Sequence, residues 1–125
     1  MPYIITTRRP YPYKAANAVP SDATIDTRTA VATLKEMRQH ARNAVEDCAQ
    51  APGWTPKYVA ARNIARDLPA EGGSIGPLPD GTVIEVQAVC WNWIIGIADD
   101  RGVDTDAVHG DGGDLAIIAA FNGAA

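Results

Sequence analysis

Alternation of apolar and polar residues predicts two strands early in the chain. Residues 3–8 (YIITTR) are rich in β-branched side chains, which favour extended backbone. Residues 24–32 alternate, so their odd-numbered positions share one face of a strand. Those positions are Ile25, Thr27, Thr29 and Val31. Residues 12–22, which include two prolines, predict a loop, and we expect the two strands to pair antiparallel across it.

Two helices are predicted next. Thr33 and Glu36 have the spacing of a capping box, with the Thr33 hydroxyl accepting from the Glu36 amide and the Glu36 side chain returning to Thr33 N–H. Apolar residues then recur at helical spacing up to Pro52-Gly53, which predicts one buried stripe. The stripe is Leu34, Met37, Ala41, Ala44, Val45 and Cys48.

The second helix is expected to begin after Thr55, with Pro56 in the favoured first position, and to close at Pro69. Its predicted inner face is Tyr58, Ala61, Ile64, Ala65 and Leu68. Because only a short connection joins the two helices, we expect them to pack antiparallel.

The second half predicts one strand and two further helices. Residues 72–79 are rich in Gly and Pro and predict a connection, and residues 78–82 (LPDGT) predict a turn. Residues 82–89 alternate as a strand with Ile84, Val86 and Ala88 inward and Glu85 and Gln87 outward. Helical spacing of Trp91, Ile94, Ile95 and Ala98 follows, ending near Gly102. Residues 99–114, with six Asp and four Gly, predict a loop, after which Asp114 caps a last helix over 115–122.

These elements predict an α+β fold: a small, mainly antiparallel sheet packed against a helical hairpin, completed by C-terminal helices. A length of 125 residues predicts a single domain over residues 1–125. We expect no signal peptide, because no long apolar run follows the start of the chain, and no membrane span. Cys48 and Cys90 both lie in apolar patterns and are expected to be free and buried, which favours a reducing, cytoplasmic location.

Charge divides the chain at residue 67. Residues 1–66 hold ten of the eleven Lys and Arg against five acids, a net of +5, whereas residues 67–125 hold Arg101 against ten acids, a net of −9. Such asymmetry predicts either a surface for a charged partner or two mutually complementary halves.

Two groups of residues are candidates for partner binding. Five cations are expected on the outer faces of the two central helices, where they could follow a phosphate backbone: Lys35, Arg38, Arg42, Arg62 and Arg66. Against this, the chain as a whole is acidic, with a pI near 5.0, and Glu46 can pair with Arg42. Trp93 and Ile97 fall opposite the main apolar stripe of their helix, so that helix is either fully buried or presents a face for a partner or a second copy.

The chemistry-bearing motifs predict no enzyme. Residues 72–76 (GGSIG) match the nucleophile elbow G-x-S-x-G with Asp104 and His109 downstream, but no strand is expected before Ser74 and prolines follow it. His40 and His109 have no neighbouring nucleophile. We therefore assign no catalytic residue and no cofactor.

A specific metal site is not expected either. The acidic loop offers Asp104, Asp106, His109, Asp111 and Asp114. From Asp104 the EF-hand register places His109 where glycine is required, so a solvated loop is favoured over a calcium site.

Four stretches resemble small accessory proteins of actinobacteriophages: residues 1–10 (MPYIITTRRP), 27–36 (TRTAVATLKE), 78–86 (LPDGTVIEV) and 117–122 (IIAAFN). The resemblance implies a phage origin and no particular activity, so it assigns no functional residue. We expect a non-enzymatic phage protein, in the host cytoplasm, that binds a host or phage macromolecule and modulates host processes or defence. The alternatives are a nucleic-acid-binding protein that uses the basic helical face, and a virion component.

Overall fold

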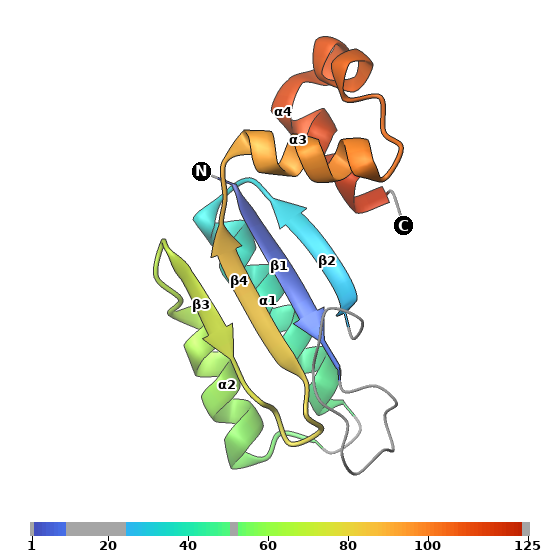
Figure 1. Cartoon of the computed structure of the whole chain (residues 1–125). Coiled ribbons are helices and arrows are strands. Elements are labelled where there is room, and N and C mark those ends of the chain that lie inside the picture. Colours follow the sequence, from blue (N-terminus) through green and yellow to red (C-terminus); the bar gives the residue numbers. More distant parts are fainter. Residues whose placement is uncertain (1, 10–24, 51–52, 124–125) are drawn as a thin grey trace.

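A computed structural model describes residues 2–9, 25–50 and 53–123, and it confirms the predicted α+β class (Figure 1). Four strands form one antiparallel sheet in the order β2-β1-β4-β3. The strands are β1 (Tyr3–Arg8), β2 (Ile25–Val31), β3 (Gly72–Ile75) and β4 (Val83–Ala88). The helices are α1 (Leu34–Ala49), α2 (Pro56–Arg66), α3 (Trp91–Asp100) and α4 (Thr105–Gly123).

The predicted pairing of the first two strands is confirmed. β1 lies between β2 and β4, with Ile5 opposite Thr29 on one side and Val86 on the other. Because side chains alternate along a strand, Tyr3 and Ile5 of β1 point to one face of the sheet and Ile4 and Thr6 to the opposite face. The sheet therefore has two chemically different faces.

The helices α1 and α2 cover the first of these faces (Figure 1). The predicted stripe of α1 is confirmed, since Met37, Ala41 and Val45 have no exposed surface and pack with β1 and β4 in one core cluster. In α2, Tyr58 and Ala65 are equally buried.

The predicted N-cap residues of α1 and α2 are confirmed, but the side-chain hydrogen bonds at both caps differ from the prediction. Thr33 Oγ accepts the Glu36 amide at 3.2 Å as expected, but the Glu36 carboxylate accepts a hydrogen bond from the Thr33 hydroxyl, at 2.9 Å, in place of Thr33 N–H. Thr55 is the N-cap of α2 without a side-chain bond. The predicted end of the first helix at Pro52 lies outside the described residues, because residues 51 and 52 are not described. The prediction that Ile64 faces inward is wrong. Its side chain is half exposed, because the buried side of α2 runs along Tyr58, Ala61 and Ala65.

The predicted connection over residues 72–79 is also wrong in its first half, because Gly72–Ile75 form the edge strand β3. Gly72 lies opposite Gln87 with φ +89°, and a side chain there would collide with the Val86 carbonyl, so the glycine content that suggested a loop is what lets this strand approach β4. The turn at residues 78–82 is confirmed, with Thr82 N–H donating to Asp80 Oδ1 at 3.0 Å.

The predicted acidic loop at residues 99–114 is largely helical. A short turn after α3 ends at Asp104, whose carboxylate accepts the Ala107 amide at 3.3 Å and starts α4. Gly113 (φ 69°, ψ −153°) breaks α4 before its apolar C-terminal part, which agrees with the predicted last helix. Gly and Asp lower helix propensity, but Asp104 caps this segment, and Val108 packs against the core that α3 and the end of α4 form.

The C-terminal helices build a second core on the other face of the sheet. Ile94 of α3 and Ile117 and Phe121 of α4 have no exposed surface and pack with Ile4 and Ala30. They cover one end of that face, where β1 begins and β4 ends, and leave the rest without a helix over it (Figure 1).

Candidate macromolecule-binding surfaces

Four of the five predicted cations lie together in one groove. Lys35, Arg38 and Arg42 of α1 and Arg66 of α2 line a groove of about 460 Å³, together with Leu34 and Gln39. The fifth, Arg62, does not: its guanidinium stands 4.9 Å from the ring centroid of the half-exposed Trp54. The predicted basic surface is thus smaller and more concentrated than the sequence suggested.

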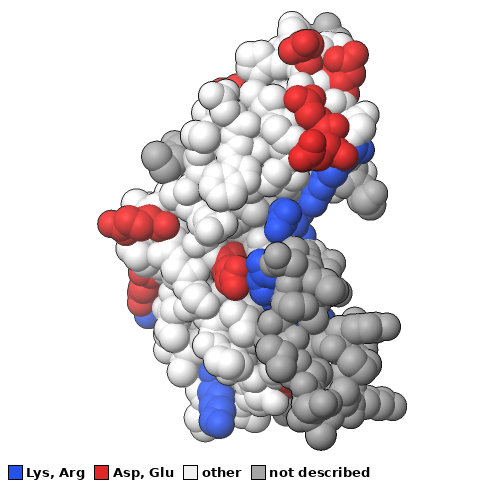
Figure 2. Space-filling model, viewed as in Figure 1, with Lys and Arg blue, Asp and Glu red and all other residues white. Residues whose placement is uncertain are grey.

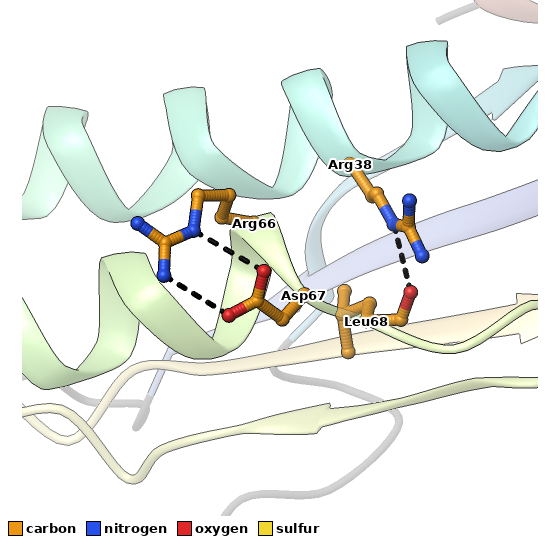
Figure 3. A network of polar contacts seen from close by, with 4 residues as sticks. All are labelled: Arg38, Arg66, Asp67 and Leu68. Carbon is orange, nitrogen blue, oxygen red and sulfur yellow. Dashed lines mark hydrogen bonds and ion pairs between the residues drawn. The ribbon is translucent and has the colours of Figure 1, made fainter.

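The groove follows from helix geometry. Lys35, Arg38 and Arg42 recur at i, i+3 and i+7, which places them on one side of α1. The hairpin brings the last turn of α2 beside the first half of α1, so Arg66 completes the same surface (Figure 3).

Two of the guanidinium groups are held by the protein (Figure 3). Arg38 donates through Nε to the Leu68 carbonyl at 2.8 Å. Arg66 makes two parallel bonds to Asp67, from Nε to Oδ1 at 3.2 Å and from a terminal nitrogen to Oδ2 at 3.1 Å. Because Arg38 is already oriented, it loses less side-chain entropy when it binds an anion, whereas the fork of Arg66 is occupied by Asp67.

The electrostatic balance of the groove is positive. Hydrogen bonds from Arg66 hold the pKa of the Asp67 carboxyl below its usual value, and the same contact raises the pKa of Arg66. Among the described residues, Lys35 and Arg42 have no ion pair, and the expected Arg42–Glu46 pair does not form. Four cations therefore face one carboxylate.

The two halves of the charge distribution lie largely on different surfaces. The groove belongs to the helical layer, whereas acidic side chains gather over α3 and α4 at the far end of the sheet (Figure 2). Arg8 and Glu85, at 3.1 Å, form a pair across the two halves within the described residues. The basic groove is not neutralised by the acidic end.

Trp93 and Ile97 lie on the opposite side of the sheet from the groove. They line a cavity of about 250 Å³ whose other walls come from β1, β2 and β4. Those wall residues are Ile4, Thr6, Arg8, Arg28, Glu85 and Gln87. Trp93 keeps 51% of its surface exposed, so the sequence-predicted interaction residues form two separate surfaces and not one.

A third cavity has no counterpart in the sequence analysis. It measures about 230 Å³ and lies between α1 and the β1–β2 half of the sheet. Its polar lining is Thr7, Arg9, Thr27, Thr29, His40, Asn43 and Asp47. The alternating threonines of β2 were visible as a strand face, but only the tertiary structure places residues of α1 beside them in one cavity.

The motifs with apparent chemistry are dispersed. Ser74 is exposed in the edge strand β3 opposite Glu85, and prolines follow it, so it has none of the strand-to-helix geometry of a nucleophile elbow. His109 bonds Asp114 at 3.1 Å on the surface of α4. Within residues 2–9, 25–50 and 53–123, no three His, Cys, Asp or Glu side chains are grouped to hold a metal ion.

Comparisons with known proteins found no matching family model, curated protein or solved structure. In the described part of the chain, none of the helices has the length and apolar character needed to cross a membrane. The site residues must therefore be interpreted from their own geometry.

Proposed function

We propose that this chain is a small non-enzymatic phage protein that binds a macromolecule of the host or the phage in the host cytoplasm, and that this macromolecule is a nucleic acid. The phage origin rests on the resemblance of the four sequence stretches. The choice of nucleic acid over a protein partner rests on the basic groove of Lys35, Arg38, Arg42 and Arg66.

The observation that carries the proposal is the convergence of four cations from two helices on one groove in a chain whose net charge is −4. An acidic protein gains nothing in solubility from concentrating its positive charge in this way. A phosphate backbone gains several contacts at once, each of which releases a bound counterion.

The geometry also suits phosphate contacts in particular. Arg38 and Arg66 are fixed by Leu68 and Asp67. Lys35 and Arg42 are exposed, have no ion pair with any residue that the structure describes, and can adapt to the spacing of successive phosphates. Arg forks match phosphate oxygens in pairs, and lysine acts as a mobile point charge.

A binding titration with a matched charge control tests this proposal. Fluorescence anisotropy of a labelled 20-base-pair duplex at low salt should show binding by the native chain and a loss of at least tenfold in the double variant Lys35→Gln/Arg42→Gln. The control is Lys57→Gln/Arg62→Gln, which removes the same charge from α2 outside the groove. Equal losses in the two variants would contradict a specific groove, and no binding by the native chain would reject nucleic acid as the partner.

A further inference from the structure

The face of the sheet beneath α3 combines an exposed aromatic ring with polar and cationic side chains. α3 carries Trp93 and Ile97 above this face, and both line the cavity formed with the strands. Trp93 keeps half of its surface exposed beside this cavity, so its ring is accessible to a ligand.

The strands set out the cavity floor in a defined order. Thr6 of β1 has Arg28 of β2 on one side and Glu85 of β4 on the other, all three pointing to the same face. Arg8 pairs with Glu85 at 3.1 Å, so the carboxylate is already neutralised. Arg28 has no ion pair among the described residues, which leaves it as the available cation of this face.

Hydrogen-bonding groups complete the surface. The Gln87 side chain, opposite Ile4 in the register, presents an amide with both donor and acceptor atoms. The Thr6 hydroxyl can donate and accept as well. The cavity therefore offers a flat ring, a cation that no described residue pairs with, and groups able to bond the edge of a planar polar ligand.

We propose that this face binds a base and its adjoining phosphate within a single-stranded nucleic acid. The base stacks on Trp93, Gln87 and Thr6 bond its edge, and Arg28 contacts the phosphate. Stacking of bases on aromatic side chains, combined with cationic contacts to the backbone, is the general chemistry of single-strand binding. The inference rests on the proposed function, since it assigns to the same protein a second, strand-selective surface on the side of the sheet opposite the basic groove.

The chemistry of the face argues for a single strand and against other occupants. Bases in a duplex are already stacked and paired, so they cannot stack on the Trp93 ring without being extruded. An apolar protein segment would bury Arg28, Thr6 and Gln87 without matching charges or hydrogen bonds. A strand supplies both a π-face and a negative charge.

The test uses the full chain and two labelled probes, a 12-nucleotide thymidine strand and a 20-base-pair duplex. Trp93→Ala should weaken binding of the strand by about 5- to 100-fold and leave duplex binding within twofold, because a stacked base contributes that much. Trp93→Phe should recover most of the lost affinity, and Arg28→Gln should weaken binding of the thymidine strand by severalfold. Trp54→Ala, which removes a similarly exposed ring elsewhere, is the control and should change neither.

The contrary outcomes are distinct. Equal effects of Trp93→Ala and Trp54→Ala on the strand would overturn the inference, as would tight binding of thymidine monophosphate alone, which would indicate a free-nucleotide site. A shift from dimer to monomer in Trp93→Ala on sizing chromatography would assign the face to self-association. If Trp93→Ala fails to fold, the substitution Arg28→Gln, at a half-buried position, carries the decision alone. If the groove variant loses duplex binding while every sheet variant keeps its binding of the single strand, this inference is refuted and the proposed function remains. If the sheet variants lose binding of the single strand while the groove variant keeps duplex binding, the groove is refuted as the binding site.

Discussion

The side-chain amide of Asn122 bonds both backbone polar groups of Ala30, 92 positions earlier in the chain. Asn122 Oδ1 accepts the Ala30 N–H at 2.8 Å, and its Nδ2 donates to the Ala30 carbonyl at 2.9 Å. Ala30 belongs to β2, an edge of the sheet, so the asparagine occupies the place of the next strand. In this way the end of α4 closes part of an edge that could otherwise pair with another chain.

Replacement of Asn122 should therefore destabilise the protein. We expect Asn122→Ala to lower the free energy of unfolding by about 1–3 kcal/mol, because it removes two partly buried hydrogen bonds and leaves the Ala30 groups without their partner. Urea denaturation measures this. Asn63→Ala, an exposed asparagine on α2 whose side chain makes no hydrogen bond in the described residues, should stay within about 0.5 kcal/mol of the native chain. Equal stability of the two variants would show that the edge contact contributes nothing.

Two glycines with the same backbone angle separate strain from collision. Gly72 and Gly102 both have φ +89°, but an added Cβ meets the Val86 carbonyl at Gly72 and open space at Gly102. We expect Gly102→Ala to cost about 1–2 kcal/mol from backbone strain alone, and Gly72→Ala to cost more than about 3 kcal/mol because β3 must also move away from β4. Thermal or urea unfolding compares them, and equal costs would contradict the close approach of β3.

The two cysteines should differ sharply in reactivity. Burial, followed by the nearby charge of Asp80, raises the pKa of the Cys48 thiol, whereas Cys90 is exposed at the start of α3. The prediction that both are free is confirmed, and the prediction that Cys90 is buried is wrong, because as the N-cap of α3 it lies where the chain turns out of the sheet. A thiol reagent at pH 8 should modify one equivalent quickly in the native chain and none in Cys90→Ser. Rapid modification of Cys48 would show that the α1 core opens readily.

The Arg66–Asp67 pair should be visible by titration. Because Arg66 lowers the pKa of Asp67 below the unfolded value of about 4, the pair stabilises the folded state above that value, and the stabilisation disappears as the pH falls through the lower folded pKa. Carboxyl-carbon NMR should locate the Asp67 midpoint below that of an ordinary aspartate. In Arg66→Gln the midpoint should return upward, and an unchanged midpoint would mean that the contact does not persist in solution.

Much of the architecture was predictable because local signals agreed with the tertiary structure. Each of these signals lies in residues within a few positions of one another. They are the apolar stripe of α1, the Thr55-Pro56 start of α2 and the alternation of β4. β3 was missed because four residues with two glycines carry no periodicity, and its formation depends on the partner strand β4. The first part of α4 was missed because Asp and Gly disfavour helices, although Asp104 caps its start and Val108 packs against the core that α3 and the end of α4 form.

The candidate sites were predictable to a smaller degree. Helical spacing placed Lys35, Arg38 and Arg42 on one side of α1, but only the packing of the hairpin brings Arg66 to them and takes Arg62 away toward Trp54. Likewise, the spacing of Trp93 identified an unpartnered residue and not the strand residues beneath it. The meeting of α3 with Arg28 depends on contacts between segments more than sixty positions apart, which no local pattern encodes.

The central claim is that the groove between α1 and α2 holds a phosphate backbone, and the salt dependence of duplex binding tests it most directly. For the native chain, the logarithm of the affinity should fall linearly with the logarithm of salt concentration, with a slope of about −0.9 for each phosphate contacted. Lys35→Gln/Arg42→Gln should make that slope less steep by the equivalent of about two phosphate contacts. Lys57→Gln/Arg62→Gln should leave the slope unchanged. An affinity that does not depend on salt, or the same slope in all three proteins, would contradict the account.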